Sequence, residues 1–186
     1  MLARLLATGG HDTSSEQWTV LVIDAPEHVN AMVTPHRVMV VFSGLFRIAT
    51  SEAELAAVLS HELGHYIADH ASEQQSNRYT LWLFLAGLLA YTALHRAWLA
   101  MGTLFTLGGG ALELWADKPL QRQHEIEADL TGMLLMADAC YDPRAMAMWW
   151  KKLMALTTSP QEPEFVSTHP PVSLAWLAVA RDDDGC

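Results

Sequence analysis

Two short apolar runs near the start of the chain, residues 18–23 and 38–42, are rich in β-branched and aromatic side chains. Runs of this composition that are bounded by turn-favouring residues are typical of β-strands. The segment between them contains Pro26, Asn30 and Pro35, which favour turns and breaks. We therefore predict two strands of a small sheet.

Helical patterns follow the two strands. The sequence Ser-Glu-Ala-Glu at 51–54 places a glutamate three residues after a serine, which fits a capping box at a helix start. We expect this helix to continue to about Ala71. Two further helices are predicted at about 122–139 and 144–156, and residues 157–171, with four prolines, are expected to form a loop.

Residues 79–112 contain two uncharged runs, 79–94 and 97–112, with His95 and Arg96 between them. Each run is shorter than the about 20 apolar residues that a membrane-spanning helix needs. A buried core helix, a re-entrant hairpin and a segment lying on a membrane surface are all compatible with this pattern. Arg96 argues against one long span.

Composition narrows the function classes. Lys and Arg total 11 against 21 Asp and Glu, and a net charge of -10 argues against a phosphate-binding surface and a nucleic-acid partner. The two cysteines, Cys140 and Cys186, are too few for a stapled scaffold or a thiolate zinc site, so we expect that disulfides do not hold this fold together. Any metal must then be bound by histidine and carboxylate. The first ten residues lack the features of a secretory or transit peptide.

The first candidate site is His-Glu-Leu-Gly-His at 61–65, inside the first predicted helix. His61 and His65 differ by about 40° around a helix axis, so both imidazoles can reach one ion. Glu62 adjoins the apolar stripe, where a carboxylate would be buried and a cation would compensate its charge. The alternative is a helix with two ordinary histidines and a chance glutamate. His70, about 140° from His65, is expected at the surface or in a second layer.

The second candidate site lies on the helix predicted at 122–139. Catalytic zinc usually takes three protein ligands and leaves the fourth position to water, so two histidines need one more donor. We choose Glu125, and expect Asp129 one turn later to support a ligating imidazole. Gly132 would let the two helices approach closely, and Glu127 is expected in solvent. The alternative is an acidic helix start, with Asp129 paired to Arg122 or another cation.

Together, HExxH at 61–65 and ExxAD at 125–129 resemble the HtpX-like zinc metallopeptidase family of the gluzincin type. Within that family the similarity is greatest to the stress-activated proteases of the mitochondrial inner membrane whose activity overlaps with the m-AAA protease. The resemblance covers about residues 17–176. Further segments that carry it are 30–32, 40–45, Arg122, 139–144 and 167–170. One departure follows Pro35, where the family has a glycine-containing turn and this chain has His36 and Arg37.

The pattern and the resemblance imply an α+β fold, a mostly helical zincin-like metalloprotease domain with a small β-sheet beside the HExxH helix. We expect one zinc metallopeptidase domain over 1–186, with an apolar insertion at 79–112 that can associate with a membrane. By the same analogy, residues 32–42 supply an edge strand for an extended substrate. Asn30, Ala31 and Met32 are its substrate-binding residues, and His169 approaches the active site.

The implied function is an ATP-independent endopeptidase with one Zn²⁺ per chain. Its substrates would be membrane or misfolded proteins, in quality control and stress response at the mitochondrial inner membrane. A bacterial membrane or periplasm is the alternative location, and a homo-oligomer is left open. In the expected mechanism, zinc lowers the pKa of its bound water to about 7 and polarises the scissile carbonyl. Glu62 then accepts the water proton, and His169 donates to the oxyanion.

Two other functions compete with the enzyme. One is a non-catalytic zinc-stabilised chaperone or membrane scaffold that uses the same ligands. A structural zinc site is normally closed by four protein ligands, whereas this sequence offers three donors and a base, which favours the enzyme. The other is a membrane-interaction module built on residues 79–112, which is compatible with either.

Overall fold

The computed structural model describes residues 1–8, 18–94 and 120–156, apart from the side chains of 92–94. The chain divides into two compact units. The first contains Met1–Ala68 and the residues from His124 onward, and the second contains Asp69–Gln123. The α+β class predicted from the sequence is confirmed, whereas the single domain with an insertion at 79–112 stays a prediction.

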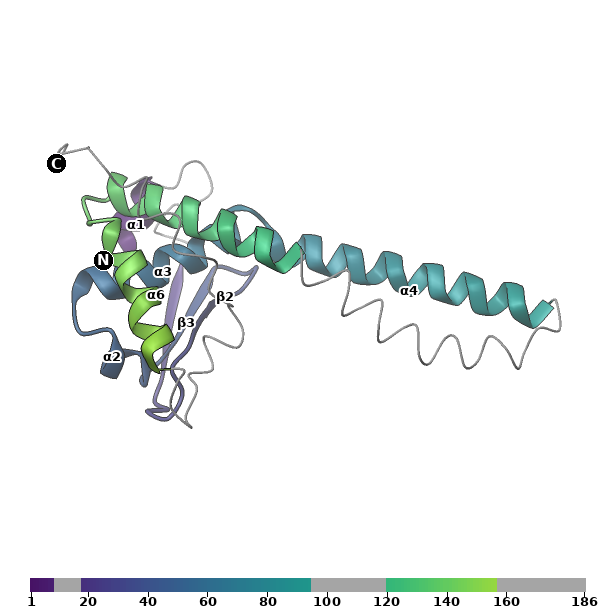
Figure 1. Ribbon diagram of the computed structural model, residues 1–186, viewed down its shortest axis with the longest axis horizontal. Helices are drawn as coiled ribbons and strands as arrows, with labels where there is room; N and C mark the ends of the chain where they lie inside the picture. Colours follow the sequence, from purple (N-terminus) through teal and green to yellow (C-terminus); the bar gives the residue numbers. More distant parts are fainter. Residues whose placement is uncertain (9–17, 95–119, 157–186) are drawn as a thin grey trace. The chain divides into compact units, whose positions relative to one another are not determined.

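A three-stranded mixed sheet forms part of the first unit (Figure 1). Its strands are β1 (Thr19–Ile23), β2 (Ala31–Val33) and β3 (Val38–Phe42), in the order β1-β3-β2. β1 runs parallel to β3, and β2 runs antiparallel to it. Both predicted strands are confirmed, but the single edge strand expected over 32–42 is wrong. Only its first two residues lie in the edge strand β2, because a turn reverses the chain and places β3 in the centre.

The turn between β2 and β3 contains His36 and Arg37, where the sequence resemblance implies a glycine-containing turn. Arg37 has a φ of 61°, a left-handed conformation that glycine adopts more readily. Its Nε donates a hydrogen bond to Tyr66 Oη at 3.0 Å. Tyr66 belongs to α3 (Glu52–Ile67), so a side-chain bond to that helix holds the turn in place of glycine.

The start of α3 has the expected cap, but its end differs from the prediction. Ser51 Oγ accepts the N–H of Glu54 at 3.1 Å, and the Glu54 carboxylate accepts the N–H of Thr50. The helix ends at Ile67 rather than Ala71. Asp69, with a φ of 53°, turns the backbone before α4 (His70–Leu94) begins, and His70 is buried rather than at the surface.

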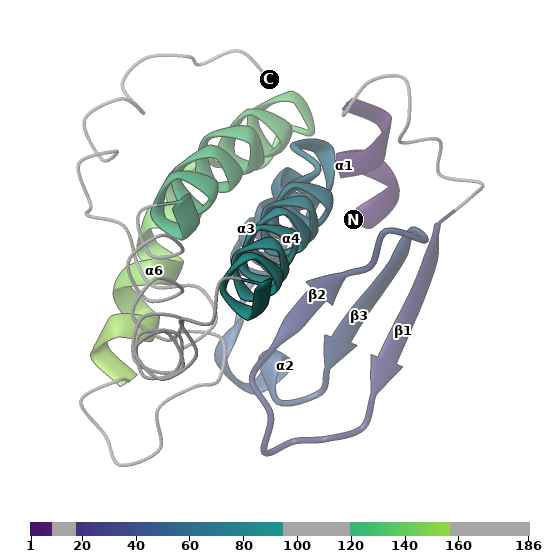
Figure 2. The ribbon, with the colours of Figure 1, turned by 90° about the vertical axis from the view of Figure 1, so that its right-hand side faces the viewer.

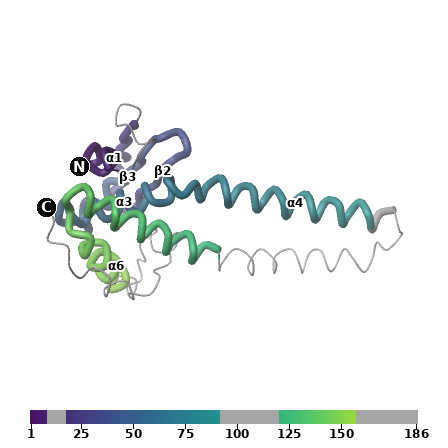
Figure 3. Tube along the Cα trace, turned by 90° about the horizontal axis from the view of Figure 1, so that it is seen from above, coloured from purple at the N-terminus to yellow at the C-terminus, as the bar shows by residue number. Residues whose placement is uncertain are grey.

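Helices lie on the other side of α3 from the sheet (Figures 2 and 3). They are the helix of residues 120–138 and α6 (Arg144–Leu156), which confirm the two last predicted helices. The short helices α1 (Leu2–Thr8) and α2 (Leu45–Ile48) were not predicted. These elements share one apolar core, whose largest fully buried side chains are Leu5, Met39, Leu45, Val58, Leu63, Met136, Met146, Trp149 and Leu153.

Two glycines bring the backbones of α3 and the 120–138 helix into contact. A Cβ on Gly64 would lie 2.5 Å from the carbonyl oxygen of Ala128, and a Cβ on Gly132 would lie 3.0 Å from the backbone nitrogen of His61. A side chain at Gly64 would overlap backbone atoms of Ala128, whereas one at Gly132 would displace the Met146 methyl group, which lies 2.7 Å from the added Cβ. The close approach predicted for Gly132 is confirmed, and Gly64 is its counterpart on α3.

Cys140 follows the 120–138 helix and is disulfide-bonded. The expectation that disulfides do not hold this fold together is therefore wrong at this position. Cys186, the other cysteine of the chain, lies outside the described residues.

In the second unit, α4 exposes most of its large apolar side chains. These are Tyr79, Trp82, Leu83, Phe84, Leu89 and Tyr91, each between 45% and 74% exposed. Over residues 79–91, the part of the 79–112 segment whose side chains the structure describes, this exposure contradicts the alternative of a buried core helix. Within the described ranges, the helices are too short or too polar to cross a membrane.

We expect Gly64→Ala to lower the free energy of unfolding by about 1–3 kcal/mol or more, as overpacked core positions do. The added methyl group would meet backbone atoms of Ala128, which cannot rotate away. Gly87→Ala in α4 is the matched control, since no atom lies within 4 Å of its added Cβ. There, the better helix propensity of alanine should leave stability unchanged or slightly higher. Urea unfolding followed by circular dichroism measures both, and an unchanged midpoint for Gly64→Ala would contradict the contact.

Candidate metal centre

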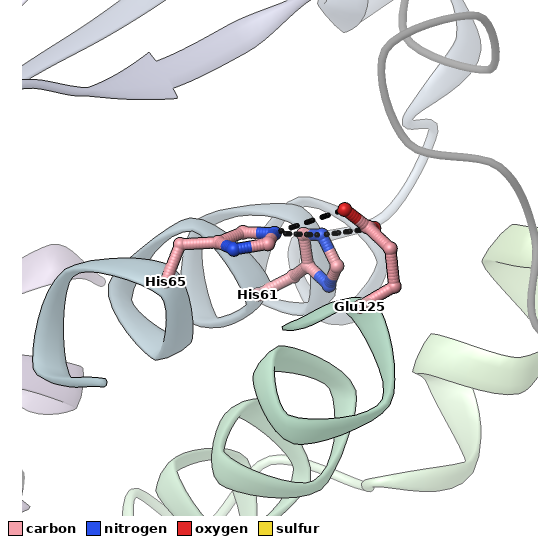
Figure 4. A group of neighbouring side chains, drawn as sticks. All are labelled: His61, His65 and Glu125. Atoms are coloured by element: carbon pink, nitrogen blue, oxygen red, sulfur yellow. Dashed lines mark hydrogen bonds and ion pairs between the residues drawn. The ribbon is translucent and has the colours of Figure 1, made fainter. Parts of the chain in front are cut away.

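Three side chains from two helices point into one small space (Figure 4). The Nε2 atoms of His61 and His65, one turn apart on α3, lie 3.1 Å from each other. Glu125, on the 120–138 helix, places Oε2 3.4 Å from His61 Nε2 and Oε1 3.5 Å from His65 Nε2. The predicted third ligand therefore lies beside the two histidines.

The separations of these atoms fit a zinc ion. Ligands arranged tetrahedrally at roughly 2.0–2.1 Å from zinc lie about 3.3–3.4 Å from one another. The measured separations of 3.1, 3.4 and 3.5 Å bracket that value. Two imidazole nitrogens and one carboxylate are also a donor set that catalytic zinc takes, whereas calcium and magnesium prefer oxygen alone.

Asp129 orients the first of the two histidines. Its Oδ1 lies 2.8 Å from His61 Nδ1 and also accepts a hydrogen bond from Trp150 Nε1 at 3.0 Å. An ionised carboxylate can only accept, so Nδ1 carries the proton and donates it. In the neutral ring, Nε2 then presents its lone pair toward His65 and Glu125. The sequence allowed Asp129 to support a ligating histidine or to pair with Arg122 or another cation. In the structure its carboxylate contacts His61.

The electrostatics of the site favour a bound cation. His61, Glu62 and Glu125 are 1%, 4% and 6% exposed. Burial alone would lower the pKa of His61, but hydrogen bonds to Asp129 and Glu125 and the charges of Asp129 and Glu62 raise it to about 10. Buried carboxylates are costly without positive charge, and either a proton or a metal ion supplies it.

Residues 2–174 match the sequence family described as Peptidase family M48. The chain belongs to this family. It is 37% identical over 153 residues to the mitochondrial metalloendopeptidase OMA1 of Arabidopsis thaliana, covering 82% of this chain and 29% of that protein. It is 34% identical over 164 residues to the Bos taurus metalloendopeptidase OMA1, mitochondrial, covering 84% of this chain and 31% of the relative.

A bacterial relative is the beta-barrel assembly-enhancing protease of Escherichia coli O157:H7, 30% identical over 164 residues. That match covers 84% of this chain and 32% of the relative. The chain therefore spans about a third of the length of these curated relatives, at 29% to 32%. The resemblance to an Oma-type metallopeptidase is confirmed at the level of the family.

Other predicted residues of this M48 chain have mixed outcomes. Glu62 is buried on α3 beside His61, as the helical position predicts. Glu127 is exposed, as expected. His169 lies outside the described residues, so its role stays a prediction. Trp150 was missed because its contact with Asp129 joins two helices through tertiary packing, which no spacing within α6 reveals.

The register of β2 decides which backbone groups face the free edge of the sheet. Asn30 O accepts from Phe42 N, and Thr34 N donates to Val38 O, so alternate residues from Asn30 to Thr34 are turned toward β3. Ala31 and Val33 are therefore turned toward the edge. The Ala31 N–H already donates to its neighbour Asn30 Oδ1 at 2.9 Å.

The three substrate-binding residues predicted from the resemblance differ in which groups they turn toward the edge of the sheet. Ala31 has its backbone carbonyl turned away from β3, but the residue is only 1% exposed and belongs to the apolar core. Met32 has its backbone directed to β3 and contributes a side chain that is 40% exposed. Asn30 is buried and bonds within the strand. Val33, which the sequence analysis did not single out, also turns its backbone groups toward the edge.

We expect Asp129→Asn to weaken zinc binding by about 10- to 100-fold, the usual effect of removing a carboxylate behind a ligating histidine. The neutral amide would no longer hold His61 Nδ1–H with a charge-assisted bond. Glu127→Gln, an exposed carboxylate on the same helix, is the matched control and should bind zinc like the unchanged protein. Competition with a chromophoric chelator measures both dissociation constants. Equal affinities in the two variants would exclude a supporting role for Asp129.

Proposed function

We propose that this chain is the catalytic region of a zinc-dependent endopeptidase that holds one zinc ion through His61, His65 and Glu125. The observation that carries the proposal is the convergence of two imidazole Nε2 atoms and one carboxylate at separations of 3.1–3.5 Å. Three protein ligands leave one position for water or substrate, which favours catalysis over a closed structural site. The relatives, which are named as metalloendopeptidases or a protease, support the same reaction class.

Each side chain has a distinct role in the proposed reaction. Bound zinc supplies Lewis-acid chemistry, which polarises the scissile carbonyl and lowers the pKa of water to about 7. The Glu62 carboxylate accepts the proton of the attacking water and delivers it to the leaving nitrogen. Asp129 keeps the imidazole of His61 in its metal-binding orientation. His169, by resemblance, donates to the developing oxyanion.

We further propose that an extended substrate pairs with the free edge of β2. The backbone N–H and carbonyl of the half-buried Val33 supply the hydrogen bonds. Met32 contributes its side chain to substrate contact. The Asn30 side chain, which holds the Ala31 N–H, borders this edge and would limit pairing at one end.

The substrates in this proposal are membrane or misfolded proteins, and the reaction is ATP-independent, as the sequence resemblance implies. Exposed apolar side chains along α4 support contact with a membrane. The names of the relatives support a mitochondrial location, or alternatively a bacterial one. Placement at the inner membrane, in quality control and stress response, rests on the sequence resemblance.

Glu62→Gln tests the reaction most simply. We expect it to abolish cleavage of a labelled unfolded protein, because an amide cannot accept the proton of water at neutral pH. Zinc content, measured by atomic emission, should stay at one equivalent. Chelation of the unchanged protein should likewise stop cleavage, and added zinc should restore it. Undiminished turnover by the zinc-loaded variant would remove Glu62 from the mechanism, and turnover that survives full chelation would exclude a metalloprotease.

Val33→Pro tests the substrate strand. Proline removes an N–H at the free edge and leaves the ladder between β2 and β3 intact, a placement that edge strands tolerate. We expect kcat/KM to fall several-fold, in line with the ~0.5–1.5 kcal/mol of one hydrogen bond, with zinc content unchanged. Val33→Thr keeps both the branched side chain and the N–H, and is the control. Equal kcat/KM values for the two variants would place the substrate elsewhere.

A further inference from the structure

A third helix reaches the metal centre through Trp150 of α6. This side chain is 7% exposed, and its Nε1 donates to Asp129 Oδ1 at 3.0 Å. Its ring stands edge-on to the imidazole of His61, with the centroids 5.3 Å apart and the planes at 78°. Trp150 therefore contacts both members of the Asp129–His61 pair.

The two hydrogen bonds to Asp129 converge on the same oxygen. Oδ1 accepts from Trp150 Nε1 and lies 2.8 Å from His61 Nδ1. The indole N–H can only donate, so it requires this oxygen to act as an acceptor. Rotation of the carboxylate would strain both bonds at once. Because the group is buried, where polar interactions are stronger than in water, the indole restrains the carboxylate in the orientation that His61 needs.

We propose that Trp150 is a positioning residue for the zinc site. It acts through Asp129 to hold the His61 ring with Nδ1–H toward the carboxylate and Nε2 toward His65 and Glu125. This inference rests on the proposed function. It adds that α6 takes part in metal affinity, although it supplies no ligand in the described part of the chain.

The neighbouring tryptophan provides a matched comparison. Trp149 is 1% exposed and packs in the apolar core. Its buried Nε1 has no hydrogen-bond partner among the described residues. Tryptophan→phenylalanine removes the same atoms at either position, so a difference in zinc binding between the two variants reports the hydrogen bond and ring contact of Trp150 rather than loss of volume.

The first experiment measures the zinc dissociation constants of Trp150→Phe, Trp149→Phe and the unchanged protein by chelator competition. We expect Trp150→Phe to raise the dissociation constant about tenfold or more, as loss of outer partners of a ligand does, and Trp149→Phe to change it less than about twofold. Equal effects at the two positions would overturn the positioning role. If the unchanged protein binds no zinc, the proposed function itself fails.

A double-mutant cycle tests whether Trp150 acts through Asp129. Interaction between neighbouring residues makes their effects non-additive. We therefore expect Trp150→Phe to weaken zinc binding in the unchanged protein but to add little in the Asp129→Asn background. Full additivity would mean that the indole acts by another route and would overturn the inference, while leaving the zinc endopeptidase intact.

A measurement on the unchanged chain covers the case in which Trp150→Phe does not fold. The indole N–H resonance of Trp150, assigned through its contacts with the His61 ring, should exchange slowly with solvent and shift when zinc binds. The corresponding resonance of Trp149 should not shift. If the chemical shift of the Trp150 indole N–H does not change on zinc binding, the positioning role is contradicted.

Discussion

The backbone contact between α3 and the 120–138 helix is the constraint on which the site depends. Gly64 faces the carbonyl of Ala128, and Gly132 faces the backbone of His61, so the two helices meet closely along the two turns that follow Glu125. The close approach helps to place the Glu125 carboxylate within 3.4–3.5 Å of the imidazole nitrogens on α3. The two glycines therefore help to bring the three candidate metal ligands together.

The same helix contact buries several carboxylates together, and these require positive charge nearby. Glu62, Glu125 and Asp129 are all nearly buried around two histidines. Removing an ion from water costs on the order of several kcal/mol even after the protein relaxes, so this cluster is stable only with positive charge beside it. A proton on His61 meets part of that demand, as its raised pKa of about 10 indicates. A divalent ion meets it more fully, which links folding of the crossing helices to metal binding.

Residues that share one helix could be predicted from the sequence, because helical geometry relates spacing to direction. His61, Glu62 and His65 on α3, and Glu125 and Asp129 on the later helix, were placed correctly relative to one another. That the two sets meet was inferred from the chemistry of zinc. Contacts that depend on tertiary packing were not predictable: Trp150 reaches Asp129 from a third helix, and the free edge of β2 depends on a three-residue strand too short to show alternation. The end of α3 was also missed, because a left-handed Asp69 has no distinctive sequence signal.

The central claim is that one metal ion joins α3 to the 120–138 helix through two imidazoles and one carboxylate. X-ray absorption at the zinc edge of the purified, zinc-loaded protein tests it most directly, because it identifies the atoms bound to the metal. The account predicts scattering from two imidazole rings together with oxygen ligands at about 2.0–2.2 Å, and no sulfur. A spectrum with a sulfur ligand, or without the outer-shell scattering of two imidazoles, would contradict it.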